Sequence, residues 1–414
     1  MENIVRDSEG VIIPTELELK EGVETVVDET IGILETRPQN PIIIAIAGGS
    51  ASGKSSAVSV KITEQIERRT GHKPLVISMD DYYRGSTFMQ EQISVGNSIN
   101  FDQPEAVDME LFEKHLKSLI RGEPIKKPIY SMRSGERDGY KTIYPSQIII
   151  VEGLFALSDR FRGLYDLGVF VRVNEHGRFI RRLLRDTSRT SMSLKQIIDY
   201  FLSTVSPAHN LYIEPTIRNA HFVINNEYSP QVESYKAPNV ENQIKLKADE
   251  VNEELLGNIG ARKSNTVNQT DYYFVPIPNT KQTRPELLRI REEQGNDNKI
   301  RIIFGYKGPR NPTRRSRVKP ILTEEINHNT EMGIRLRYKE TGVVRKVRET
   351  WVWQDGFRFY VDTVQVTKRG LTRNIGRFIE IDMSQTLSEE YIQTLLHSLG
   401  ARRRNRVLKP YILL

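Results

Sequence analysis

The sequence predicts an α/β domain with a mostly parallel sheet, followed by a mostly antiparallel β-barrel domain of the α+β type. In the first half, short apolar stretches separated by helix-compatible stretches recur at residues 42–47, 75–79, 147–151, 168–173 and 221–224. Such alternation is typical of βαβ units and a parallel sheet buried on both faces. After about residue 225, charged and apolar residues alternate, which indicates antiparallel strands.

These patterns divide the chain into five parts. They are an N-terminal extension (1–40), the α/β domain (41–228), a polar linker (229–239), the β domain (240–402) and a C-terminal tail (403–414). A length of 414 residues suits two or three domains. There is no cysteine, no apolar run is long enough to cross a membrane, and the first residues do not resemble a secretory signal. We therefore expect a cytoplasmic protein with no membrane partner.

The first strand runs into a phosphate-binding loop. Gly48-x-x-x-x-Gly53-Lys54-Ser55 is a complete Walker A pattern, preceded by an apolar strand and followed by a helix-compatible segment. Small residues let backbone N–H groups contact phosphate oxygens, while the lysine bridges the β- and γ-phosphates and the serine hydroxyl binds Mg²⁺. The α/β domain is therefore expected to be of the P-loop NTPase type. The expected ATP-binding residues are Gly48, Gly49, Ser50, Ala51, Ser52, Gly53, Lys54, Ser55 and Ser56.

Acidic residues end two later strands. Asp80 and Asp81 follow the strand at 75–79, and Glu152 follows the strand at 147–151, at the sheet edge where α/β proteins bind ligands. Such a carboxylate either accepts a proton from an attacking hydroxyl or holds Mg²⁺. The segment RFIRRLLRDTSR adds a group of arginines that either close over the transferring phosphate or form an ordinary basic surface: Arg181, Arg182, Arg185 and Arg189.

From about residue 42 to residue 225 these motifs resemble the uridine kinase and phosphoribulokinase family. The similar segments are GGSASGKSS, MDDYYR, NFDQPEAVD, KKPIYSMRSGER and IEPTIRNAHFVI. The resemblance implies an ATP-dependent kinase in which Asp80 activates the acceptor hydroxyl, Lys54, Arg185 and Arg189 act on the phosphates, and Glu152 lies near the metal. It places Tyr83, Asp102, Tyr130 and Arg137 around the acceptor.

Two segments depart from that family. Gly135 stands about where nucleoside kinases carry a histidine, and the lid segment RDTSRTSMS is about two residues shorter than the family's. The motifs therefore indicate phosphoryl transfer to a small-molecule acceptor more strongly than they indicate uridine.

The second domain is basic. Residues 301–350 hold 13 Lys/Arg against 5 Asp/Glu, which predicts an anionic partner. Period-two alternation places charged residues, and the neutral Gln243, together on one face of each expected strand: Glu241, Gln243, Lys245 and Lys247; Arg289, Arg291 and Glu293; Arg335, Arg337 and Lys339; Glu380 and Asp382. These faces either point to solvent or line the inside of a barrel whose apolar faces pack outward against helices. Clustered like charge favours the barrel, because a polyanion would offset the repulsion.

From about residue 240 to residue 400 the chain resembles the CYTH, or triphosphate tunnel, domains. The similar motifs are ENQIKLK, LLRIREE, FGYKGP and IGRFIEID. The resemblance implies an eight-stranded tunnel that binds triphosphate or another phosphoanhydride, often hydrolysing it with Mg²⁺ or Mn²⁺. It implies phosphate contacts from Lys245, Arg289, Arg291 and Lys307, with Arg345 and Arg348 as further candidates, and metal ligands in Glu241, Glu380 and Asp382. With the cations Lys247, Arg335 and Arg337 of the charged strand faces, nine polyphosphate-binding residues are expected. Gln243 replaces a glutamate of the family, which weakens the metal site.

Three functions remain open at this point. The first is a kinase that uses ATP and Mg²⁺ on a small-molecule hydroxyl. The second is a phosphoanhydride hydrolase working in the tunnel, with the P-loop domain regulatory. The third is a nucleic-acid binder, which the scarcity of stacking aromatic residues disfavours. A homo-oligomer is compatible with all three.

Overall fold

The computed structural model describes residues 4–6, 12–94, 96, 100–227, 239–247, 253–276, 286–308, 317–353 and 358–382, together with residues 397, 407 and 411. The side chains of residues 239–243, 253, 317–321 and 382 lie outside the described part, as does most of the expected linker. The chain forms two compact units. The first comprises residues 1–182 and 200–228, and the second comprises residues 183–199 and 229–414.

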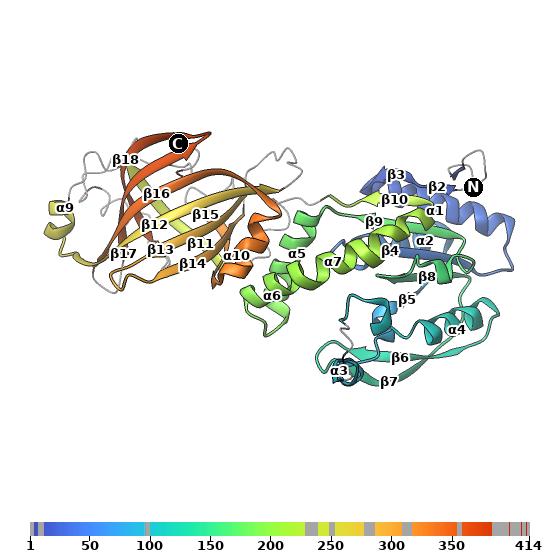
Figure 1. The fold of residues 1–414 in the computed structure, drawn as a ribbon. Helices are drawn as coiled ribbons and strands as arrows, with labels where there is room; N and C mark the ends of the chain where they lie inside the picture. Colours follow the sequence, from blue (N-terminus) through green and yellow to red (C-terminus); the bar gives the residue numbers. More distant parts are fainter. Residues whose placement is uncertain are drawn as a thin grey trace. The chain divides into compact units, whose positions relative to one another are not determined.

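The first unit is built on a parallel sheet (Figure 1). Its strands, in spatial order, are β3 (Thr15–Glu18), β10 (Phe222–Asn225), β9 (Leu167–Arg172), β4 (Ile42–Gly48), β8 (Ile148–Gly153) and β5 (Leu75–Ser78). All the described pairings between them are parallel. The predicted parallel α/β fold is confirmed.

Alternate residues of β4 enter the cores on opposite faces of this sheet. Ile42, Ile44 and Ile46 pack with helices α1 (Leu19–Thr36) and α2 (Val60–Thr70), whereas Ile43, Ala45 and Ala47 pack in the other core with helix α4 (Met109–Ile120). Every residue of β4 is buried, which explains why this strand has no polar alternation.

The structure corrects the expectation that residues 1–40 form a separate extension. Within them, β3 pairs with β10 at the edge of the sheet, and α1 is part of one of its cores. A strand hairpin, β6 (Ile125–Ser131) and β7 (Glu136–Ile143), also escaped prediction. The first unit also contains α3 (Ser86–Ser94) and the first part of α5 (Glu175–Arg189). The later residues of α5 and most of α6 (Leu194–Tyr200) are grouped with the second unit.

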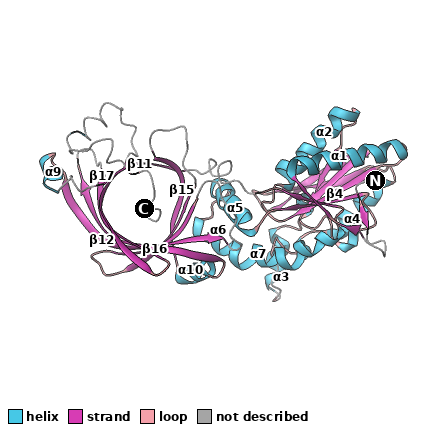
Figure 2. Ribbon diagram, turned by 90° about the horizontal axis from the view of Figure 1, so that it is seen from above, coloured by secondary structure: helices cyan, strands magenta, loops and turns pink. Residues whose placement is uncertain are grey.

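Eight antiparallel strands of the second unit close into a barrel (Figure 2). They are β11 (Asn239–Lys247), β12 (Arg262–Pro276), β13 (Leu287–Gln294), β14 (Ile300–Lys307), β15 (Arg317–Ile326), β16 (Tyr338–Val352), β17 (Arg358–Lys368) and β18 (Leu371–Asp382). The ring is complete because β11 pairs with both β15 and β18. The antiparallel barrel that the sequence predicts is thus present.

Charged side chains occupy the inner face of the barrel. Ile244 and Ile379 belong to an apolar cluster that also contains Leu256 of α9 (Glu253–Asn258), so this face of their strands is the outer one. Lys245 and Glu380, next to them in sequence, pair with each other on the opposite face. Of the two arrangements open from the sequence, the structure has the one with charges inside.

One strand prediction in this unit is wrong. Arg335 and Arg337, which were expected on a strand with Lys339, instead lie in helix α10 (His328–Arg335) and the turn after it, and β16 (Tyr338–Val352) begins only at Tyr338. The Asn327 side chain caps α10 by accepting a hydrogen bond from the Thr330 N–H at 2.9 Å. In the part of the chain that is described, no helix is long and apolar enough to cross a membrane.

Candidate functional site: a phosphate loop and a charged barrel interior

The phosphate loop connects the end of β4 to the helical segment Lys54–Ser59. Gly53 has φ of 84°, a left-handed conformation that favours glycine, and a Cβ there would lie 2.4 Å from the Asn226 side-chain nitrogen. Asn226 donates to the Ser52 carbonyl at 2.7 Å. The loop is therefore held from the end of β10 as well as by its own turn.

Arginines of α5 border this loop. Arg182 Nη1 donates to Ser50 Oγ at 2.8 Å, and Arg181 Nη1 donates to the Ser52 carbonyl at 3.4 Å. A Cβ on Gly49 would lie 2.9 Å from Arg178 Cδ and 2.7 Å from His209 Nδ1, so both side chains touch the loop backbone. His209 is anchored by Glu214, 2.9 Å from its Nε2, and burial lowers the pKa of His209.

Several buried polar atoms around the loop have no hydrogen-bond partner among the described residues. They are Arg178 Nε and Nη1, His209 Nδ1, Ser52 Oγ and Glu152 Oε2. Burial lowers the pKa of Arg178, while Glu175, Glu214 and Asp102 act to raise it. Unpaired buried polar groups are costly, so this arrangement suits a ligand that brings charge of both signs, such as a nucleotide with its metal. Glu152 and the Ser55 hydroxyl fit Mg²⁺ chemically.

The predicted acceptor residues gather beside Asp80. The rings of Tyr83 and Tyr130 lie 5.4 Å apart. Burial, then Asp80 and Asp102, raise the pKa of Tyr83, whereas burial, then Glu136 and Asp80, raise the pKa of Tyr130. Asp81 instead forms an ion pair with Lys127. The two consecutive aspartates therefore have different neighbours.

Arg137 has a different environment from the other predicted acceptor residues. Its Nε donates to the Tyr83 carbonyl at 2.8 Å, and its Nη2 donates to the Tyr82 carbonyl at 3.0 Å and to Asp108 at 3.3 Å. These bonds fasten hairpin β6–β7 to the segment that carries Asp80. An acceptor contact by Arg137 stays a prediction, and its observed role is to hold the neighbouring backbone.

Tyr200 connects the acceptor side to the phosphate loop. Its hydroxyl donates to Asp102 at 3.3 Å, and its ring lies 5.5 Å from the guanidinium carbon of Arg182. Because Arg182 bonds Ser50, three consecutive contacts run from Asp102 to the loop. The sequence analysis missed Arg178, Tyr200, His209 and Asn226 as residues of this site.

Arg185 and Arg189, the predicted catalytic arginines, fall in the segment 183–199 that is grouped with the barrel unit. Arg185 Nε donates to Asp186 at 2.7 Å, and Arg189 is exposed at the end of α5. Their role at the phosphates stays a prediction.

Inside the barrel, Asp271 is surrounded by cations. Arg291 donates to it through Nε at 2.6 Å and Nη2 at 3.0 Å, and Arg289 Nη1 lies 3.5 Å away. Burial acts to raise the pKa of Asp271, but Arg289, Arg291 and Lys346 together hold it well below its usual range. Asp271 is 1% exposed, so the barrel buries a carboxylate only because these cations neutralise it.

Asp362 and Glu380 complete a continuous charged network. Arg348 forms two bonds of 2.7 Å with Asp362 and also contacts Glu380, whose other oxygen lies 2.7 Å from Lys245 Nζ. Arg348 on β16 and Glu380 on β18 meet across β17, as inward-facing side chains can. The inner cluster, as we call it below, comprises the cations Lys245, Arg289, Arg291, Lys346 and Arg348 and the acids Asp271, Asp362 and Glu380.

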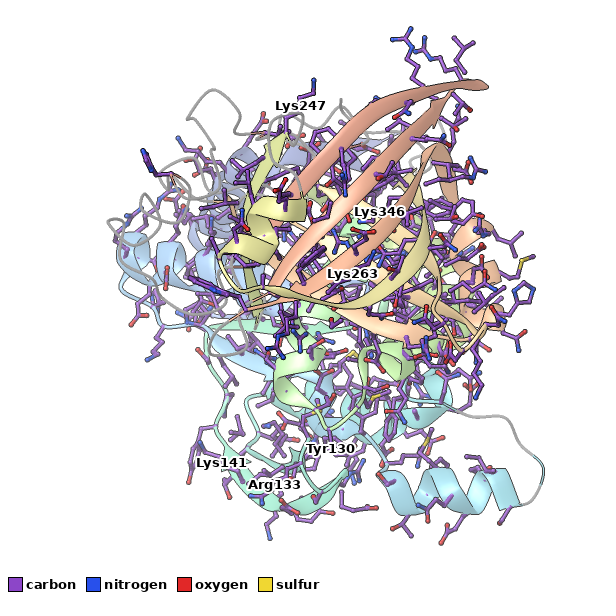
Figure 3. The ribbon with its side chains drawn as sticks, turned by 90° about the vertical axis from the view of Figure 1, so that its left-hand side faces the viewer. Tyr130, Arg133, Lys141, Lys247, Lys263 and Lys346 are labelled. Atoms are coloured by element: carbon purple, nitrogen blue, oxygen red, sulfur yellow. The ribbon has the colours of Figure 1, made fainter. Side chains whose placement is uncertain are left out.

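Lys346 is the inner cation that the sequence analysis missed. It is buried, 3.6 Å from Asp362 and 3.9 Å from Asp271, and lies among the barrel strands in Figure 3. Burial, with a contribution from Arg348, lowers its pKa to about 7. Arg289 Nε is buried without a hydrogen-bond partner among the described residues. The five basic side chains of the inner cluster thus outnumber its three acidic side chains.

Four of the nine predicted polyphosphate residues, namely Lys245, Arg289, Arg291 and Arg348, lie in the inner cluster. Three other predicted residues do not lie on the inner face of the barrel, so these predictions are wrong. Arg335 is on α10 and stacks on Tyr272, Arg337 is in the following turn, and Arg345 is exposed, with Nη1 3.4 Å from Thr367 Oγ1. Lys247 is exposed at the end of β11 (Figure 3), and Lys307 ends β14.

A metal site in the barrel finds no support in the described residues, where no group of three acidic or histidine side chains is placed to hold an ion. Both oxygens of Glu380 are engaged by cations. The side chains of Glu241 and Asp382 lie outside the described part, so their metal role stays a prediction.

A parallel sheet with a Walker A loop, strand-end acids and bordering arginines defines a P-loop kinase, and the charged barrel defines a second domain. Residues 43–232 match the model of the phosphoribulokinase / uridine kinase family, and residues 237–400 match the model of the CYTH domain. The chain belongs to the phosphoribulokinase / uridine kinase family and carries a CYTH domain after its kinase domain.

Curated relatives match the kinase half. The uridine kinase of Bacillus pumilus is 40% identical over 188 residues, covering 44% of this chain and 86% of that protein. The uridine kinase of Bacillus subtilis is 37% identical over 191 residues, covering 45% and 86%. Among solved structures, a possible uridine kinase from Bacillus stearothermophilus is 21% identical with a TM-score of 0.33, covering 50% of this chain and 100% of that one.

Proposed function

We propose that the first unit transfers the γ-phosphoryl group of ATP to a hydroxyl of a nucleoside such as uridine. The observation that carries this is the position of Asp80 in the turn Met79–Tyr82, which follows β5 at the same sheet edge as the phosphate loop and leads directly into Tyr83. The curated relatives that the kinase half matches are uridine kinases.

The chain's own groups divide the work of this reaction. Loop N–H groups and Lys54 bind the phosphates, and the arginines beside the loop neutralise charge that develops on them. Asp80 accepts the proton of the acceptor hydroxyl, a contribution of typically about 10²–10⁴ in rate. Glu152 and Ser55 would hold Mg²⁺, which when bound neutralises phosphate charge.

The test is ADP release with ATP and Mg²⁺ over a panel of uridine, cytidine, other nucleosides and sugars. We expect turnover with a pyrimidine nucleoside, its loss in Lys54→Ala, and a fall of about 10²-fold or more in Asp80→Asn. Asp81→Asn is the matched control, because Asp81 pairs with Lys127 and should leave most of the turnover. Retained ATP binding with no phosphorylated acceptor would refute the proposal.

A second candidate function belongs to the barrel, which we propose binds a triphosphate or another condensed phosphate. The supporting observation is the inner cluster, in which the described residues include five basic side chains against three acidic ones and give the buried Arg289 Nε no hydrogen-bond partner. Guanidinium groups suit phosphate oxygens because their N–H groups form paired bonds. Hydrolysis is the further step that the CYTH relationship suggests.

Phosphate release from tripolyphosphate and pyrophosphate, first with Mg²⁺ and then with Mn²⁺, tests this function. Activity in the tunnel should survive Lys54→Ala and disappear in the Arg289→Ala/Arg291→Ala double variant. The reverse dependence would assign the activity to the phosphate loop. Tripolyphosphate binding that is lost in the double variant, without any phosphate release, would leave a binding role alone.

A further inference from the structure

A tyrosine from the C-terminal tail lies within the inner cluster. Tyr411 is 3% exposed, and its hydroxyl donates to Asp362 Oδ2 at 2.9 Å. Its ring packs against Phe378, with 5.0 Å between centroids. Val407 bonds the barrel as well, because its N–H donates to the Lys245 carbonyl at 2.9 Å. Residues 407 and 411 are thus part of the barrel rather than of a separate tail.

The ring of Tyr411 covers two of the cations. Lys245 Nζ lies 3.2 Å from the ring centroid and Lys346 Nζ lies 5.5 Å from it. A cation near an aromatic face is stabilised, but by far less than a cation beside a phosphate oxygen in the same surroundings. The ring therefore holds a position that an anion would need in order to contact Lys245.

The hydroxyl of Tyr411 strengthens this arrangement. Asp362, to which it donates, also accepts both bonds from Arg348, so the phenol adds a third donor to a carboxylate that positions the cluster. Burial, then Glu380 and Asp362, raise the pKa of Tyr411 well above its usual value. The ring is therefore neutral at physiological pH and occupies the cluster without adding charge.

We propose that Tyr411 is an intramolecular competitor for the anion site of the barrel, and that a condensed phosphate binds by displacing its ring from Lys245 and Lys346. This inference rests on the phosphate-binding role proposed for the barrel. It makes Tyr411 the residue that decides which anions enter, because only a ligand with several phosphate groups gains enough contacts to replace the ring and its bond to Asp362.

The test is calorimetric titration of the full-length protein with tripolyphosphate and with orthophosphate. Tyr411→Ala should bind tripolyphosphate about tenfold or more tightly than the wild type, and it should gain measurable affinity for orthophosphate. Tyr411→Phe, which keeps the ring and loses one hydrogen bond, should fall between the two. Tyr144→Ala is the matched control, since Tyr144 is 72% exposed on the other unit, and its binding should equal that of the wild type.

A measurement on the wild-type ring keeps the test independent of variant folding. In protein labelled with 3-fluorotyrosine, the ¹⁹F resonance that disappears in Tyr411→Phe belongs to Tyr411. It should move toward the position of a solvent-exposed tyrosine when tripolyphosphate is added. An unmoved resonance in the presence of bound tripolyphosphate, or weaker binding by Tyr411→Ala, would overturn the proposal while leaving the barrel site intact. No binding by any variant would remove the barrel site and the competitor together.

Discussion

Arg182 and Ser50 join helix α5 to the phosphate loop through a bond of 2.8 Å between Nη1 and Oγ. The serine is one of the small residues that the Walker A pattern leaves unspecified, and the arginine is one of four that the sequence placed near it. Their contact fixes the Arg182 side chain beside the loop.

Arg182→Ala should weaken ATP binding. The variant loses a charge-assisted hydrogen bond to the loop, worth about 1.5–3 kcal/mol, so the Kd for ATP should rise roughly 10- to 100-fold. Fluorescence titration with a labelled ATP analogue and competition by ATP would measure it. Arg218→Ala is a suitable control, because Arg218 is exposed and pairs with Asp159. Equal ATP affinity in the two variants would show that Arg182 does not support the loop.

Tyr200→Phe should affect the acceptor more than the nucleotide. The substitution removes the bond to Asp102 but keeps the ring beside Arg182. We expect the KM for the acceptor to rise about 2- to 10-fold, as for one lost hydrogen bond, with the KM for ATP unchanged. Steady-state kinetics with each substrate varied in turn would separate the two effects. Equal changes in both values would mean that Tyr200 acts only by general packing.

Tripolyphosphate binding to the barrel should strengthen as the pH falls through about 7, the pKa to which burial and Arg348 lower Lys346. Lys346 gains its charge below that pH, and a polyanion binds the charged form better. Between pH 8 and pH 6 the Kd should fall about tenfold beyond the change that the ligand's own titration causes. Lys346→Met isolates the ligand's part, and the same pH dependence in both proteins would contradict the assignment. The other ionisable side chains that face or border Lys346 are those of Arg291, Arg348, Asp271, Asp362 and Tyr411.

Asp362→Ala should destabilise the barrel strongly. The substitution removes the carboxylate that pairs with both Arg348 and Lys346 and leaves only Glu380 and Asp271 beside these cations. Breaking a buried ion pair costs about 3–5 kcal/mol. Calorimetry should show a lower transition temperature for the barrel, while the kinase transition stays in place. Asp297→Ala, which removes an exposed ion pair with Arg301, should leave both transitions nearly unchanged. An unshifted barrel transition in Asp362→Ala would contradict the proposed role of this carboxylate.

The sequence predicted the two architectures because each has a strong local signature. The continuously apolar β4 and β8 can only be buried on both faces, and the alternation in β11, β13 and β18 places their charges on one face. The edge strand β3 was missed because the four residues TELE lack a distinctive apolar pattern. The segment before Tyr338 was misassigned because GIRLRYKE alternates like a strand, whereas the Asn327 cap begins a helix.

Two kinds of error affect the predicted sites, one in local strand geometry and one in contacts between residues distant in sequence. Arg345 and Arg348 were both proposed for the interior, although residues three apart in a strand point to opposite faces. The same rule places Lys346 with Arg348 and excludes Arg345, so this error was avoidable. In contrast, no local pattern connects Tyr200 to Asp102 or Tyr411 to Lys245, because only the tertiary structure brings these distant segments together.

The closure of β11 onto β18 limits how copies of this protein can associate. An open sheet can recruit a further strand from another molecule through the unpaired N–H and C=O groups at its border, but each described barrel strand already has two neighbours. A homo-oligomer formed through the barrel would therefore depend on complementary side chains of its outer surface. Substitution of those side chains, rather than of backbone-pairing positions, would be the way to dissociate it.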